Sequence, residues 1–105
     1  MHQGEKLMTA LRATQQKYPH CVKEIRGRGL MIGVEFTHED IAGLAIAGLA
    51  QRQVLVAYSL NNARVTRFEP PLNISDAELE WAARAFEEAV AQTAELVADF
   101  DINEE

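Results

Sequence analysis

The residues with the clearest chemical potential form the run Arg-Phe-Glu-Pro-Pro-Leu at positions 67–72. Arg67 stands at the end of a short β-type run, and Pro70 and Pro71 follow it closely. Because proline has no N–H donor, the pair stops strand pairing and keeps the segment extended. An arginine fixed at a strand end offers a planar fork that grips a carboxylate through two parallel hydrogen bonds. The sequence therefore makes Arg67 a candidate carboxylate ligand, with a surface ion pair to a nearby acid as the alternative.

The other reactive residue types form no catalytic or metal-binding set. His20 and Cys21 are neighbours, and neighbours in an extended chain point to opposite sides, so they do not form a nucleophile–base pair. The residues at 38–40 (His-Glu-Asp) open a predicted helix, and three consecutive residues do not converge on one metal ion. Cys21 is the only cysteine, which excludes an internal disulfide and a cysteine-based zinc site.

The composition is that of one soluble domain. The chain has 105 residues, 48% of them hydrophobic and 25% charged, and a chain of this size buries roughly 60–70% of its unfolded surface. Its net charge of −6 argues against nucleic-acid binding, which depends on phosphate neutralisation. No signal-peptide pattern is present, and the apolar run at 41–50 is shorter than the ~20 residues of a membrane helix. We therefore expect a cytoplasmic protein that binds neither nucleic acid nor membranes.

The first third of the chain predicts a helix followed by two strands. Apolar residues at helical spacing indicate a helix over 5–18, and Pro19 marks its end. Residues 22–26 and 30–36 are typical of strands, the second with strict alternation. The Gly-Arg-Gly run at 27–29 lies between them, where glycine supplies the conformations of a tight turn. A β-hairpin is therefore expected.

A second helix is expected after Thr37 and through about Arg52. Thr37 and Asp40 offer an N-cap and a first-turn acid. Gly43 and Gly48 each cost the helix roughly 1 kcal/mol relative to alanine. They also allow a neighbouring element to approach closely.

The remaining elements are two strands and a long helix. Residues 54–58 and 65–69 predict the strands, joined by a loop at 59–63. Ser75 and Glu78 form a capping box before an apolar stripe at three- and four-residue spacing.

The order α-β-β-α-β-β-α predicts a two-layer α+β domain. Its sheet should be small and mostly antiparallel, with helices covering one face. The domain is expected to span residues 1–98, followed by an acidic tail at 99–105 that frays. The pattern does not determine the strand order.

Three stretches together resemble the C-terminal small domain of class III pyridoxal-phosphate-dependent aminotransferases. They are residues 67–72, the run Arg-Gly-Arg-Gly-Leu-Met-Ile-Gly-Val-Glu at 26–35, and Leu-Asn-Asn-Ala at 60–63. Within the family the likeness is to the diamine (putrescine-type) branch and to acetylornithine and ornithine aminotransferases. It covers nearly all of this chain but only the C-terminal part of a full enzyme.

The resemblance implies a role for three residues. Arg67 would grip the α-carboxylate of the glutamate/2-oxoglutarate pair, and Asn61 and Asn62 would border the substrate entrance. The intact enzyme, a homodimer, would move an amino group from a diamine or ω-amino donor to 2-oxoglutarate.

The resemblance also implies that essential parts lie elsewhere. Pyridoxal phosphate (PLP) needs a lysine that holds it as a Schiff base and an acid beside its pyridinium nitrogen. In the family these groups and most of the phosphate site lie in an upstream large domain, and none of Lys6, Lys17 and Lys23 stands in that context. We expect the chain alone to bind no PLP and to have no transaminase activity.

Two other classes of function stay open for this chain. A free-standing, non-catalytic α+β module that binds a partner or a small carboxylate fits the composition equally well. An RNA-binding fold would fit the α/β alternation and the Arg-Gly-Arg-Gly run at 26–29. The negative charge, the single copy of that run and the lack of aromatic residues around Arg67 argue against it.

Overall fold

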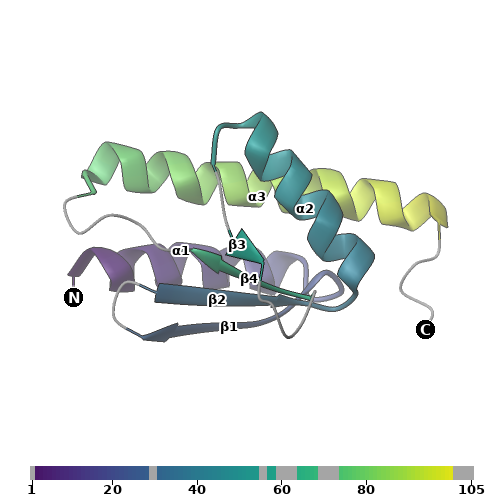
Figure 1. Cartoon of the computed structure of the whole chain (residues 1–105), viewed down its shortest axis with the longest axis horizontal. Coiled ribbons are helices and arrows are strands. Elements are labelled where there is room, and N and C mark those ends of the chain that lie inside the picture. The colour runs from purple at the N-terminus through teal and green to yellow at the C-terminus, as the bar shows by residue number, and fades with distance from the viewer. Residues whose placement is uncertain (1, 29–30, 55–56, 59–63, 69–73, 101–105) are drawn as a thin grey trace.

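The computed structural model describes residues 2–28, 31–54, 57–58, 64–68 and 74–100. Every predicted element is present in the predicted order (Figure 1). The helices are α1 (His2–Lys17), α2 (Glu39–Gln51) and α3 (Asp76–Phe100), and the strands are β1 (Val22–Arg28), β2 (Met31–Phe36), β3 (Ala57–Tyr58) and β4 (Val65–Phe68).

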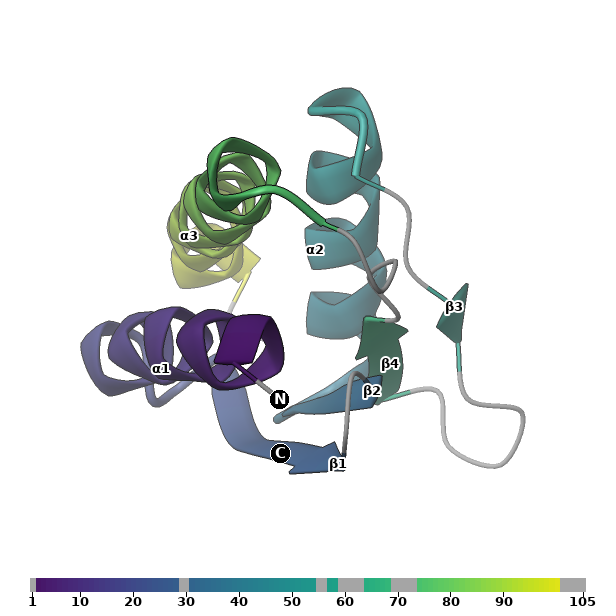
Figure 2. The same cartoon turned by 90° about the vertical axis from the view of Figure 1, so that its left-hand side faces the viewer.

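The strands form one antiparallel sheet in the order β1-β2-β4-β3. β4 therefore lies next to β2, although the whole of α2 separates the two in the chain. The helices all lie on one face of this sheet (Figure 2). The prediction of a two-layer α+β fold is confirmed, and we call the face without helices the open face.

The core lies between the sheet and the helices. The alternate β2 residues Ile32, Val34 and Phe36 are fully buried there, because successive strand residues point to opposite faces. From α3, Phe86 meets Phe68 of β4 edge to face, with ring centroids 5.8 Å apart. Each fully buried side chain of this size stabilises the fold by roughly 1.5–3 kcal/mol.

The β1–β2 hairpin extends further than its glycines predicted. Gly27 and Arg28 belong to β1, so the expectation that they form the turn is wrong. Gly27 pairs with Ile32 and Arg28 pairs with Met31, so the two strands continue into the expected turn. A Cβ atom on Gly27 would stand 2.0 Å from the sulfur of Met8, so glycine allows α1 to lie closely over the strand.

The start of α2 also differs from the sequence prediction. The N-cap is His38, whose Nδ1 accepts the Asp40 N–H at 3.0 Å. Thr37, the predicted cap, instead donates its hydroxyl to the His20 carbonyl at 2.7 Å. A tertiary contact has therefore taken the hydroxyl that local propensity assigned to capping.

α2 ends in a Schellman motif. The Gln53 N–H donates to the Ala50 carbonyl at 3.0 Å, and the Val54 N–H donates to the Leu49 carbonyl at 2.9 Å. Gln53 has a φ of 65°, which is the left-handed conformation that this motif requires. The Arg52 side chain then ties the end of α2 to α3, because it contacts Glu88 at 3.1 Å and Gln92 at 3.2 Å.

The capping box of α3 is confirmed. The Glu78 N–H donates to the Ser75 Oγ at 3.1 Å, and the Ser75 N–H donates to the Glu78 carboxylate at 3.0 Å. α3 continues through Phe100, two residues into the segment that the sequence assigned to a tail. None of the helices in the described ranges is long and apolar enough to cross a membrane.

Candidate carboxylate-binding site

β4 places Arg67 on the open face. Thr66 and Phe68 are buried on the helix side, whereas Arg67 between them is exposed. In the sheet register Arg67 stands between Gly33 of β2 and Ala57 of β3. Its two cross-strand partners in the described sheet are thus a glycine and an alanine.

Gly33 leaves the sheet surface beside Arg67 uncovered. Among the described atoms, a Cβ on Gly33 would meet only the Arg26 carbonyl oxygen, at an ordinary 3.9 Å. Arg26 is also the cross-strand partner of Gly33 in β1. The register therefore sets two arginines in one row across the sheet, with a glycine between them.

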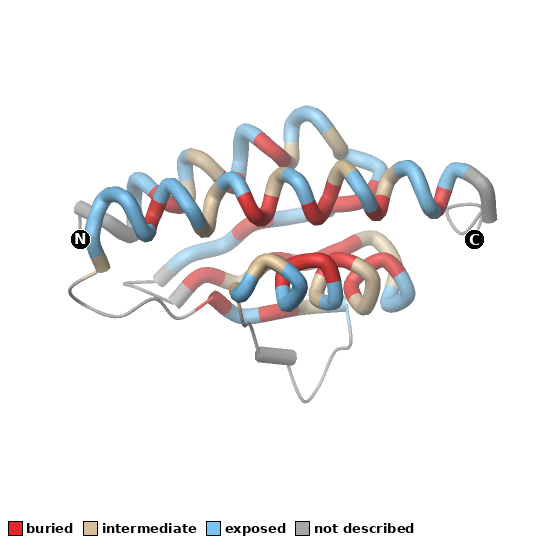
Figure 3. The backbone as a smooth tube through the Cα atoms, turned by 90° about the horizontal axis from the view of Figure 1, so that it is seen from above, coloured by how far each residue is buried: buried red, intermediate tan, exposed pale blue. Residues whose placement is uncertain are grey.

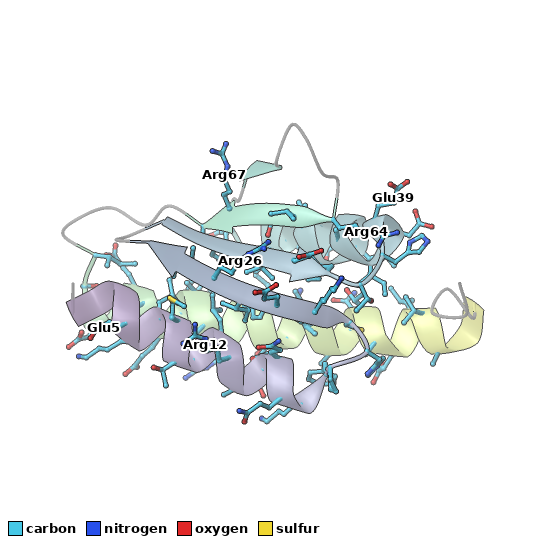
Figure 4. All side chains as sticks on the ribbon, turned by 90° about the horizontal axis from the view of Figure 1, so that it is seen from below. Glu5, Arg12, Arg26, Glu39, Arg64 and Arg67 are labelled. Carbon is cyan, nitrogen blue, oxygen red and sulfur yellow. The ribbon has the colours of Figure 1, made fainter. Side chains whose placement is uncertain are left out.

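The two arginines of this row have different surroundings. Arg26 approaches Glu35 at 3.3 Å and Glu24 at 3.6 Å, and Lys23 lies 3.9 Å from the same Glu35. Figure 4 shows Arg67 on the β3 side of the sheet, pointing away from Arg26. Arg26 is thus committed to the acids of β1 and β2, whereas Arg67 stands apart from that cluster.

Arg64, the other arginine near β4, does not share this position. It precedes the strand, and its carbonyl accepts the Phe36 N–H at 2.7 Å. Its side chain lies beside Glu39 of α2, at the opposite end of β4 from Arg67 (Figure 4). The structure therefore separates the two arginines.

The structure describes part of the predicted site. Asn61, Asn62 and the segment 69–73 with its proline pair lie outside the described residues. Asp76, an acid near Arg67 in sequence, has Lys6 of α1 at 3.4 Å. Gly33 was not among the residues predicted for this surface. A sequence pattern could have indicated it, because this glycine interrupts the row of side chains on the exposed side of β2.

Other reactive groups in the described part form no second site. No cluster of three or more His, Cys, Asp or Glu residues in those ranges could hold a metal ion. Cys21 is buried, and burial raises the pKa of its thiol to about 11, which leaves it unreactive near neutral pH. The described part of the open face therefore carries Arg67 together with the ion-paired cluster of Arg26, Glu24 and Glu35.

The comparison with protein families decides what this surface belongs to. The family model of class III aminotransferases matches residues 1–90. The chain belongs to the class III aminotransferase family. The resemblance of residues 26–35 and 67–72 to class III aminotransferases is thus confirmed at the level of the family.

Solved aminotransferase structures share the fold. Lysine aminotransferase from M. tuberculosis is 32% identical with a TM-score of 0.78, over 86% of this chain and 20% of that one. Ornithine aminotransferase from Toxoplasma gondii is 30% identical with a TM-score of 0.77, over 90% of this chain and 22% of that one. A transaminase with L-alanine, 24% identical with a TM-score of 0.79, supports the fold alone. The chain therefore spans only about a fifth of the length of the two aminotransferases named first.

Class III aminotransferases use PLP, and the T. gondii enzyme is described with partial occupancy of PLP at its active site. The three lysines of this chain all lie in surface ion pairs. A hydrogen bond from Lys17 to Glu87 raises the pKa of that lysine. Each lysine has a carboxylate within ion-pair distance: Lys6 with Asp76, Lys17 with Glu87, and Lys23 with Glu35.

Proposed function

We propose that this chain is the part of a class III aminotransferase that docks a substrate carboxylate, with Arg67 as the docking group. The observation that carries the proposal is the position of Arg67. It is exposed on the open face, beside Gly33, near the end of β4. A charge-assisted bidentate contact there contributes roughly 1.5–3 kcal/mol. Its effect is to orient the substrate rather than to transfer protons.

The substrates we propose are a diamine or ω-amino donor and 2-oxoglutarate as acceptor. The family supports the reaction type, and two of the matched structures are named for lysine and ornithine. Both amino acids carry an amine far from their carboxylate. The putrescine-type donor and the placement of Asn61 and Asn62 at the substrate entrance are parts of the same proposal.

The amino-transfer chemistry itself is assigned to PLP and to an upstream large domain. This chain would contribute carboxylate binding to a composite site, in a cytoplasmic homodimer. We expect that the 105 residues alone do not carry out transamination.

Replacing Arg67 by alanine in the full-length enzyme should separate the two half-reactions. We expect kcat/KM for the glutamate/2-oxoglutarate half-reaction to fall about 10- to 100-fold, because the lost contact is worth roughly 1.5–3 kcal/mol. The half-reaction with the amine donor should change far less. Single-turnover rates measured by cofactor absorbance give both values, and Arg64→Ala is the matched control. An equal loss in both half-reactions would refute the assigned role.

The isolated chain provides a second test. We expect NMR titration with 2-oxoglutarate to give weak shifts centred on Arg67, and PLP to give no stoichiometric response. A missing dicarboxylate response would show that Arg67 needs the large domain to form a site. Saturable binding of PLP, or transaminase turnover by this chain, would contradict the composite-site proposal.

A further inference from the structure

Trp81 forms one wall of a hollow on the outer side of α3. Buried, half-buried and exposed residues alternate along this helix (Figure 3), and Trp81 is 55% exposed although it is a large apolar residue. The hollow has a volume of about 190 Å³, and the described residues that line it are Trp81, Arg52, Arg84, Ala85 and Glu88. A space of this size holds a single ring or a short aliphatic chain, since pockets for drug-sized ligands begin at about 300 Å³.

The walls of the hollow are fixed by hydrogen bonds within the fold. The Trp81 indole N–H donates to the Arg52 carbonyl at 3.2 Å, which holds the ring against the end of α2. The Arg52 guanidinium is held in turn, because it donates to the Gly48 carbonyl at 2.8 Å, to Glu88 at 3.1 Å and to Gln92 at 3.2 Å. A preformed site of this kind loses little conformational freedom when a ligand binds.

Arg84 is the residue of the hollow whose charge stays unused within the described part of the chain. It is exposed, and it makes no ion pair or hydrogen bond with another described residue. Arg52 and Glu88 neutralise each other at 3.1 Å, so the described walls carry one net positive charge. The planar guanidinium of Arg84 can hold a carboxylate through two parallel hydrogen bonds.

The acids around Arg84 leave most of this charge available. Glu87 is paired with Lys17 of α1, as Glu88 is with the end of α2. Glu80, one turn before Arg84, is exposed and lies toward α1, where both residues line a second hollow between α1 and α3. An exposed pair at this spacing changes an equilibrium only about twofold.

We propose that the hollow beside Trp81 binds a small carboxylate with an apolar body, either a single ring or a short aliphatic chain. The carboxylate pairs with Arg84, and the apolar body lies against the indole of Trp81 and the methyl group of Ala85. Burial of apolar surface provides the affinity, and the charge selects acids over amides of the same shape.

This hollow is separate from the proposed docking group of the aminotransferase. α3 belongs to the helix layer (Figure 2), whereas Arg67 projects from the open face of the sheet (Figure 4). Binding beside Trp81 therefore does not depend on the role proposed for Arg67.

Tryptophan fluorescence of the 105-residue chain tests the proposal, because Trp81 is the only tryptophan. With phenylacetate as the probe we expect a saturable change and a Kd between about 0.3 and about 10 mM, since a ligand of this size has few atoms to contribute. Phenylacetamide keeps the ring but lacks the charge, and acetate keeps the charge but lacks the ring. Each should bind at least about tenfold more weakly than phenylacetate.

Arg84→Gln should weaken phenylacetate binding at least about tenfold, because it removes a charge-assisted contact. Glu80→Gln should strengthen binding about twofold, because it removes the nearest acid without an ion pair in the described part. Arg12→Gln, an exposed change on α1, is the matched control and should leave the Kd unchanged. Circular dichroism spectra of these variants should overlay, since every substituted residue is exposed.

Four results would overturn the proposal. They are the absence of a saturable change well above this range of Kd, equally tight binding of phenylacetamide, equally tight binding of acetate, and a Kd that Arg84→Gln leaves unchanged. Equal binding of acetate would mean a nonspecific anion contact, and equal binding of phenylacetamide would mean an apolar contact without charge selection.

Discussion

At the scale of single residues, β4 shows how one strand serves two environments. Arg67 faces the open side of the sheet, and its neighbour Thr66 is fully buried on the helix side. Among the described residues, the Thr66 hydroxyl has no hydrogen-bond partner. A buried hydroxyl without a partner costs about 1–3 kcal/mol of desolvation. The Thr66 hydroxyl therefore lowers the stability of the fold.

Thr66→Val should stabilise the chain, because it replaces the unpartnered hydroxyl by a methyl group of similar size. We expect the free energy of unfolding to rise by about 1 kcal/mol, measured by urea denaturation. Thr93→Val is the control, because the Thr93 hydroxyl is equally buried but donates to the Ala89 carbonyl at 2.8 Å. Destabilisation by Thr66→Val would mean that the hydroxyl has a partner in solution.

At the scale of elements, helix ends account for much of the local order. The capping box places the Glu78 carboxylate against the Ser75 N–H and hydroxyl. These hydrogen bonds, the backbone one foremost, lower the pKa of Glu78 in the folded chain. A lowered pKa means that the ionised carboxylate stabilises the fold above its ordinary pKa. That stabilisation is lost as the pH falls through the folded-state value.

Glu78→Gln should reveal this dependence, because glutamine keeps the capping geometry but does not ionise. At pH 7 the variant should be less stable than the wild type. The difference should shrink as the pH is lowered toward about 2, because Glu78 then becomes protonated in the folded state as well as in the unfolded state. Urea denaturation at neutral and at low pH measures it, with Glu80→Gln, two residues further along α3, as a matched control. A difference that persists unchanged at low pH would contradict a contribution from the ionised carboxylate.

At the scale of the whole molecule, the packing of α2 on α3 depends on one close approach. A Cβ on Gly48 would stand 3.0 Å from the Ala89 Cβ and 3.4 Å from its Cα. Ala89 is held by its own helix and cannot move aside as a flexible side chain would. The small residue in α2, which costs the isolated helix stability, therefore allows the two helices to meet.

Gly48→Val should force α2 and α3 apart and lower the free energy of unfolding by about 1–3 kcal/mol, as other overpacked cores do. Thermal and urea denaturation both measure the change. Gly33→Ala is the control, because its added Cβ meets only the Arg26 carbonyl among described atoms, at 3.9 Å. Equal destabilisation by the two substitutions would show that the close approach is not the cause.

The sequence by itself determined the order and type of the elements, because periodicity and helix-cap chemistry are local properties of the chain. The α3 capping box and the alternation in β2 both appear in the structure as predicted. The family resemblance likewise rested on short runs, and the match over residues 1–90 confirms it. The roles of Asn61 and Asn62 stay predictions, since both lie outside the described residues.

Only the tertiary structure decided which residues share a surface. The pairing of β2 with β4 sets Gly33 beside Arg67, and no local pattern gives the strand order on which this depends. Pairing with Ile32 places Gly27 in a strand rather than a turn. The contact of Thr37 with His20 left the capping of α2 to His38. In each case a contact between residues distant in sequence outweighed a local preference, because packing and hydrogen-bond energies of about 1 kcal/mol match or exceed propensity differences.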